Sequence, residues 1–120
     1  NRSFHIYNNK IFNSKIIFFG ASSALAKKFN LLKEMNIIPD YICDNDINKH
    51  GKEVESYIIH NPEILFNQDE EFIVIITSSF IDEIKSQLAK YPNIKEVYSY
   101  NEISYKLKTE WEFGEKDGEL

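Results

Sequence analysis

The residues with the clearest chemical potential follow a short apolar run near the start of the chain. Gly20 comes directly after the run Lys15–Phe19, and Ser22 and Ser23 follow it. The run has the length and the β-branched and aromatic content of a buried strand. A helix is expected next, because apolar residues recur at helical spacing at Leu25, Ala26, Phe29 and Leu32. A strand, a glycine turn and a helix N-terminus together predict a phosphate site.

An acidic turn supplies a second set of groups. Asp44 follows a short strand expected at 41–43, about twenty residues after Gly20, where a carboxylate can bind ribose hydroxyls. Asp46 is the alternate for this role. An ordinary acidic turn explains the same residues without any ligand.

The glycine turn has two interpretations as well. The stretch Gly20–Ala26 resembles the Gly-x-x-x-Gly-x-Gly turn of short-chain dehydrogenases, with Ala24 and Ala26 in place of glycines. Each Cβ occupies space where a pyrophosphate would approach. The alternative is a tight strand-to-helix turn in which Ser22 or Ser23 only caps the helix.

No residue pattern predicts a catalytic group or a metal site. Tyr91 and Lys95 have the spacing of a dehydrogenase Tyr-x-x-x-Lys pair, but Pro92 lies where the helix would have to continue. Cys43 is expected to be a small core residue. The three histidines lie on separate elements without metal-ligand spacing, at positions 5, 50 and 60.

The order of elements predicts the fold. Strands are expected at 15–19, 41–43, 55–60, 72–77 and 94–98. Helices are expected at 3–12, 23–35, after Ser78 or Ser79, and at 101–108. This order predicts an α/β, Rossmann-like open parallel sheet of five strands in the order 3-2-1-4-5, with helices on both faces. Ligands of such sheets bind at the carboxyl ends of the strands, here the loops 20–23, 44–46 and 77–79.

Composition narrows the classes of partner. The chain has 120 residues and a formal net charge of -5, with a single Arg among its 14 basic residues, so a nucleic-acid partner is not expected. No apolar run is long enough for membrane insertion. The single cysteine fits a reducing compartment, so we expect a cytoplasmic protein. We expect one domain at 1–108 and a polar tail or linker to a missing domain at 109–120, cut from a longer chain.

The chain from Lys15 to about Ile103 resembles the Rossmann-like domain of bacterial polysaccharide-biosynthesis and nucleotide-sugar-modifying proteins. The likeness lies in Ile17–Ser22, in the acidic turn Asp44–Gly51, and in Asn61–Leu65 leading into the strand from Phe72. It implies a nucleotide ligand, either NAD or a nucleotide sugar. By position, Gly20, Ala21, Ser22 and Ser23 would face phosphate, Asp44 and Asp46 the ribose or base, and Thr77 and Ser78 the far side.

The expected function is a nucleotide or nucleotide-sugar binding module of a larger protein of capsule or lipopolysaccharide synthesis, without catalysis of its own. Two alternatives remain open. One is a fragment of an NAD-dependent sugar oxidoreductase or dehydratase, and the other is a ligand-free structural or dimerisation domain. A homodimer is compatible with each of them.

Overall fold

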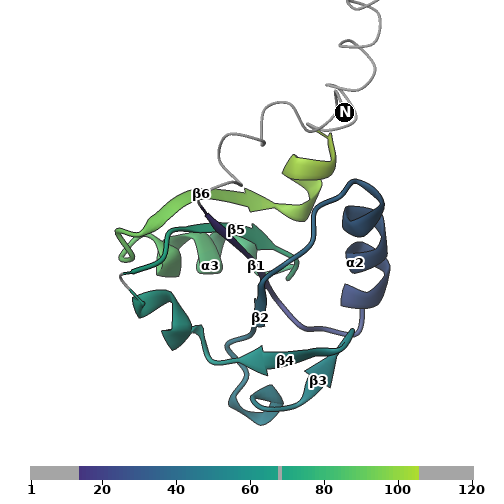
Figure 1. Ribbon diagram of the computed structural model, residues 1–120, viewed down its shortest axis with the longest axis horizontal. Helices are drawn as coiled ribbons and strands as arrows, with labels where there is room; N and C mark the ends of the chain where they lie inside the picture. Colours follow the sequence, from purple (N-terminus) through teal and green to yellow (C-terminus); the bar gives the residue numbers. More distant parts are fainter. Residues whose placement is uncertain (1–13, 68, 106–120) are drawn as a thin grey trace, which may run out of the picture.

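The computed structural model describes residues 14–67 and 69–105 (Figure 1). The helix expected at 3–12, residues 106–108 of the expected closing helix, and the tail from Thr109 lie outside the described residues. In the described part of the chain, no helix has the length and apolar character that a membrane crossing requires.

A six-stranded sheet forms the centre of the molecule. Its strands are β1 (Lys15–Phe19), β2 (Tyr41–Cys43), β3 (Glu53–Val54), β4 (Tyr57–His60), β5 (Phe72–Ile76) and β6 (Ile94–Ser99). The strand order is β3-β4-β2-β1-β5-β6, and every neighbouring pair is parallel except β3–β4. The expected sheet of five strands, all parallel, is therefore wrong in its strand count and at one edge. The five mutually parallel strands keep the relative order expected, and antiparallel β3 is added outside them.

The additional strand arises from a two-residue hairpin. Glu55 and Ser56 join β3 to β4 with φ angles of 51° and 69°. Two successive left-handed residues form the type of turn whose twist matches that of paired strands. Such turns usually contain Asn-Gly or Asp-Gly, and neither pair is present here. The strand expected at 55–60 is therefore wrong at residues 55 and 56, which form this turn.

Strands β1 and β5 are the buried middle of the sheet. They pair in parallel from Lys15 opposite Phe72 to Phe19 opposite Ile76, as the apolar runs predicted. Successive β1 side chains point to opposite faces. Ile16 and Phe18 join one core layer, whereas Ile17 and Phe19 join the other.

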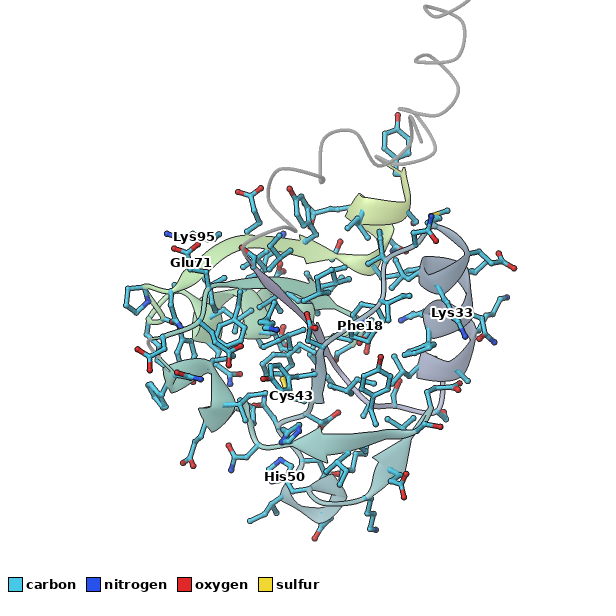
Figure 2. All side chains as sticks on the ribbon, in the orientation of Figure 1. Phe18, Lys33, Cys43, His50, Glu71 and Lys95 are labelled. Carbon is cyan, nitrogen blue, oxygen red and sulfur yellow. The ribbon has the colours of Figure 1, made fainter. Side chains whose placement is uncertain are left out.

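One helix covers each of these layers, which confirms helices on both faces. Helix α2 (Leu25–Glu34) buries Leu25, Phe29 and Leu32 in the layer that contains Phe18. Helix α3 (Ile81–Leu88) buries Ile84 and Leu88 in the opposite layer. Figure 2 shows Phe18 inside the molecule and Lys33 of α2 outside it.

The ends of these helices differ in part from the expectation. Asn36 follows the end of α2 in the left-handed region, with φ 62°. The expected serine caps are wrong, because the N-cap residues are Ala24 and Phe80 and neither helix has a side-chain cap hydrogen bond. A serine can cap a helix only from the N-cap position, and Ala24 and Phe80 occupy these two positions.

Two short 3-10 helices and a final helical segment complete the fold. The 3-10 helices are η2 (Ile47–Lys49) and η3 (Pro62–Phe66). Asn61 caps η3 by accepting from the Glu63 backbone N–H at 2.9 Å. Residues 100–105 are helical. A reciprocal capping box starts this segment, because Ser99 and Glu102 each bond the other's backbone N–H.

Candidate functional site

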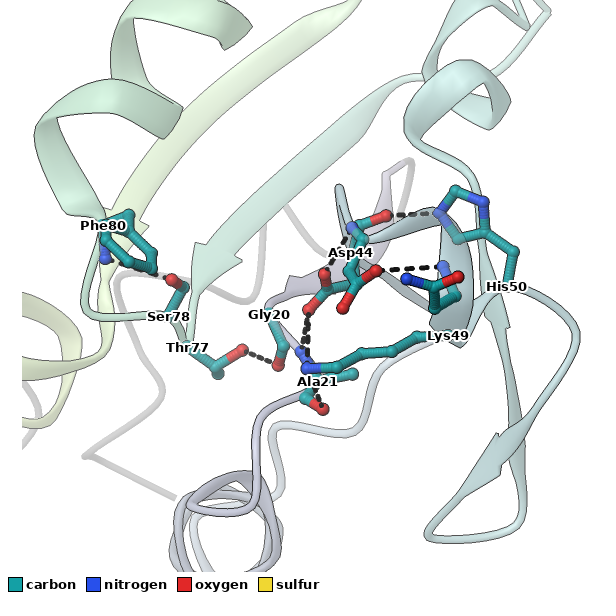
Figure 3. A network of polar contacts seen from close by, with 10 residues as sticks. Gly20, Ala21, Asp44, Lys49, His50, Thr77, Ser78 and Phe80 are labelled. Atoms are coloured by element: carbon teal, nitrogen blue, oxygen red, sulfur yellow. Dashed lines mark hydrogen bonds and ion pairs between the residues drawn. The ribbon is translucent and has the colours of Figure 1, made fainter.

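The loops expected to bind a ligand do converge, at the carboxyl ends of β1, β2 and β5 (Figure 3). Gly20 follows β1, Asp44 follows β2, and Thr77 follows β5. The parallel pairing of these three strands brings the groups together. Hydrogen bonds inside the protein already use several of them.

Gly20 is required by the close approach of the β5 loop. Its φ is +130°, and a Cβ at this position would lie 2.6 Å from the backbone nitrogen of Ser78. The buried hydroxyl of Thr77 donates to the Gly20 carbonyl at 2.7 Å. The glycine thus lets two loops of the protein meet, which is a different task from admitting a pyrophosphate.

Asp44 holds the glycine turn from the other side. Its Oδ2 accepts from the Ala21 backbone N–H at 2.7 Å, and its Oδ1 accepts from the Asp46 N–H at 2.8 Å. Ala21 is one of the residues that were expected to face phosphate. The Asp44 carboxylate therefore occupies the place of an anion at this turn.

Lys49 and His50 belong to the same network, although neither was expected to have a role there. Lys49 Nζ lies 3.9 Å from Asp44 Oδ2 and donates to the Ala21 carbonyl at 3.2 Å. His50 Nε2 lies 2.7 Å from the Asp44 carbonyl oxygen. A carbonyl oxygen only accepts, so this contact places the proton on Nε2. The sequence feature that could have predicted these contacts is the short polar loop after Asp44. Through η2, this loop brings Lys49 and His50 back close to Asp44.

The remaining predicted groups lie around this centre. Ser22 and Ser23 are exposed at the start of α2. Asp46 caps η2 by accepting from the Asn48 N–H at 2.9 Å, and Ser78 Oγ accepts from the Phe80 N–H at 3.0 Å. Ser22 and Ser23 are therefore the most accessible of the residues that were expected to bind phosphate.

A hollow of about 230 Å³ opens beside the turn. Gly20, Asp44 and Ser78 line it, together with Asn45, Phe80 and Glu83. Phe80 is 64% exposed although its side chain is large and apolar. We call this space the first hollow. It presents an aromatic face and two carboxylates, and neither Phe80 nor Glu83 was expected at the site.

Residues 12–98 match the family described as C2185-like, N-terminal. The chain belongs to the C2185-like N-terminal family. No curated protein matches the sequence.

A solved structure shares the fold of this C2185-like domain. The crystal structure of UDP-D-quinovosamine 4-dehydrogenase from Vibrio fischeri superposes with a TM-score of 0.54 and 21% sequence identity. The match covers 70% of this chain and 75% of the other chain. The likeness supports a Rossmann-like α/β fold with the mostly parallel sheet described above.

The described part of the C2185-like domain assembles neither of the catalytic groups weighed in the sequence. Tyr91 lies in the turn before β6 and Lys95 lies in β6, where it pairs with Glu71 at 3.2 Å. The dehydrogenase-type pair is therefore ruled out. Burial raises the pKa of the Cys43 thiol well above its ordinary value, which disfavours the nucleophilic thiolate. Residues 14–67 and 69–105 contain no cluster of three or more potential metal ligands among His, Cys, Asp and Glu.

Proposed function

We propose that this chain is a nucleotide-sugar binding module that performs no reaction alone. We place it in a larger protein of bacterial glycan synthesis. The observation that carries the proposal is the first hollow, which lies at the carboxyl ends of parallel strands and joins the exposed Phe80 ring to the Asp44 carboxylate. Open α/β sheets bind their ligands at this place. The resemblance to nucleotide-sugar-modifying proteins supports the choice of ligand.

The charges of the first hollow favour the nucleoside end of such a ligand. Asp44 and Glu83 both line the space, so a phosphate group inside it would meet two carboxylates. A nucleobase can pack on the exposed Phe80 ring. Ribose hydroxyls can donate to the Asp44 carboxylate, whose side chain is 15% exposed.

The phosphates then lie outside the glycine turn. The Ala21 N–H is already bonded to Asp44, which leaves the exposed hydroxyls of Ser22 and Ser23 at the start of α2 as donors. The positive end of the helix dipole is at the same place. A nucleotide sugar or NAD should therefore bind better than NADP, because the 2′-phosphate of NADP would approach Asp44.

Calorimetry on the purified chain tests this proposal with UDP-glucose, UDP-N-acetylglucosamine, NAD and NADP. We expect Phe80→Ala to weaken binding of the nucleotide sugars about tenfold, the usual effect of losing an aromatic stack. Tyr105→Ala is the matched control, because Tyr105 is 72% exposed and does not line the first hollow. Equal effects of the two changes would contradict the proposed position of the base.

A second candidate function, a ligand-free scaffold, is favoured by the closed glycine turn. Gly20 packs against the backbone of Ser78, and Asp44 fills the anion position. The absence of binding by all four ligands at millimolar concentration would replace the first proposal with this one. Steady NADH formation or consumption with a nucleotide sugar would instead support an oxidoreductase.

A further inference from the structure

The diphosphate of the proposed ligand calls for a positive charge that the first hollow does not offer. Asp44 and Glu83 line that space, and the whole chain has a formal net charge of -5. A diphosphate is itself an anion, so these carboxylates repel it. If the phosphates lie at Ser22 and Ser23, a cation is needed on the same side of the sheet edge, next to helix α2.

Lys28 of helix α2 places its ammonium group at this edge. Lys28 Nζ donates to the Thr77 carbonyl oxygen at 2.8 Å, and Thr77 Oγ1 donates to the Gly20 carbonyl oxygen at 2.7 Å. Long side chains of a helix point back toward its N-terminus. Lys28 does so, because Thr77 follows β5 at the carboxyl ends of the strands, where α2 also begins. The ammonium therefore lies beside the glycine turn that precedes Ser22.

The charge of Lys28 lacks a counter-ion. Its side chain is partly buried, and no carboxylate of residues 14–67 and 69–105 forms an ion pair with it. It contacts the Thr77 carbonyl oxygen and the ring of Tyr100, whose centre lies 5.6 Å from Nζ, and neither group carries a net charge. Taking an ammonium partly out of water costs free energy that an anion offsets. Two of its three N–H donors remain for such an anion.

The other ammonium groups at this end of the fold fit the task less well. Lys49 also contacts the glycine turn, but Asp44 Oδ2 lies 3.9 Å from its Nζ and offsets its charge. Lys90 lines a second hollow, of about 360 Å³, which no residue of α2 borders. Lys27 is exposed, and its side chain bonds no described residue. Lys28 alone among these four combines partial burial with a charge that no carboxylate offsets.

We infer that Lys28 binds the diphosphate of the nucleotide ligand and makes the site selective for nucleoside diphosphates over nucleosides. The inference rests on the proposed function, from which it takes the position of the phosphates at Ser22 and Ser23. The ammonium donates to phosphate oxygens and supplies the charge that the two serine hydroxyls lack. The contacts with Thr77 and Tyr100 hold the Lys28 side chain at this place before the ligand arrives.

A comparison of UDP with uridine isolates the phosphate contact, because the two ligands share the nucleoside. Ligand-observed NMR titrations give both affinities. The wild-type chain should bind UDP at least about tenfold more tightly than uridine. Lys28→Met removes the charge but keeps an unbranched side chain. It should lower the affinity for UDP about tenfold and leave the affinity for uridine unchanged. Lys28→Arg should retain most of the preference for UDP.

A neighbouring lysine provides the matched control. Lys27→Met removes the same charge from the same helix at an exposed position, so the preference for UDP should stay as in the wild-type chain. Added salt should weaken binding of UDP to the wild-type chain more than binding to Lys28→Met, because salt screens a contact between charges. Thermal unfolding by circular dichroism confirms that each variant is folded.

The role of Lys28 and the binding of the nucleoside fail separately. Equal affinities of the wild-type chain for UDP and uridine would overturn the role of Lys28, as would an equal loss of UDP binding in Lys27→Met and Lys28→Met. A similar loss of both ligands in Lys28→Met would also overturn it, since the bond to Thr77 would then only support the turn. In each of these cases nucleoside binding stands. No binding of either ligand by the wild-type chain would overturn the proposed function itself.

Discussion

Asp44 has a structural task at the scale of single residues, and this affects how it can be tested. Its carboxylate accepts from the backbone N–H groups of Ala21 and Asp46 and lies near Lys49. Removing the carboxylate leaves a partly buried N–H group without its charged acceptor. A loss of ligand affinity in Asp44→Ala would therefore mix a ribose contact with a disturbed turn.

We predict that Asp44→Ala lowers the free energy of unfolding by about 1–3 kcal/mol, the usual cost of losing a hydrogen bond to a charged group. Urea denaturation followed by circular dichroism measures it. The control is Asp69→Ala, since Asp69 is exposed and no described residue bonds its carboxylate. If both variants lose the same stability, Asp44 does not hold the turn.

At the scale of elements, the hairpin between β3 and β4 can be stabilised by a substitution in its turn. Ser56 has φ 69°, in the left-handed region that favours glycine. We predict that Ser56→Gly raises the free energy of unfolding by about 0.5–1 kcal/mol, because the relief of backbone strain exceeds the entropy that glycine adds to the unfolded chain. Ser79→Gly is the control at a position where φ is not positive, and urea denaturation should show no gain there.

Glu102 of the capping box after β6 should make the stability of the fold depend on pH. Glu102 accepts from Lys85 Nζ at 2.8 Å and from the Ser99 backbone N–H at 3.0 Å. The hydrogen bond from Lys85 is the largest cause that lowers the Glu102 pKa from 4.5 to about 2, followed by that from Ser99. These bonds join α3 to the helical segment at 100–105.

A lowered carboxyl pKa stabilises the folded state above the unfolded pKa. The Glu102 contribution should therefore be complete above about pH 5 and disappear as the pH falls from 4.5 toward 2. The Glu102 side chain is 50% exposed, so solvent screening keeps the contribution below about 1 kcal/mol. Urea denaturation at several pH values between 2 and 6 gives the free energy of unfolding at each pH. This free energy should change less with pH in Glu102→Gln than in the wild-type chain. An unchanged dependence on pH would refute this assignment.

At the scale of the whole molecule, the sequence predicted the layers better than the contacts within the site. Continuous apolar runs predicted β1 and β5, because a strand buried on both faces needs no polar alternation. The edge strand β3 was missed, since its turn uses Glu55 and Ser56 instead of a glycine pair. The capping box at Ser99 and Glu102 was visible as Ser-x-x-Glu, but the closing helix was placed from Asn101 instead.

The candidate site illustrates the same limit. Topology was enough to predict that Gly20, Asp44 and Thr77 meet, because parallel strands end at one edge. The direction of the Asp44 carboxylate depends on the backbone N–H groups of Ala21 and Asp46 and on the ammonium of Lys49. No spacing in the sequence specifies such contacts, and the ligand roles of these residues stay predictions.

The burial of Cys43 makes its thiol a probe of local opening of the protein. It is the single cysteine, it is completely buried at the end of β2, and Figure 2 shows it within the sheet. A thiol reagent can reach it only after the protein opens locally, so the rate of labelling measures how often such openings occur. A nucleotide seated on the neighbouring Asp44 would hold the end of β2 closed. Slower labelling would then report occupancy of the site without any tag or dye attached to the protein.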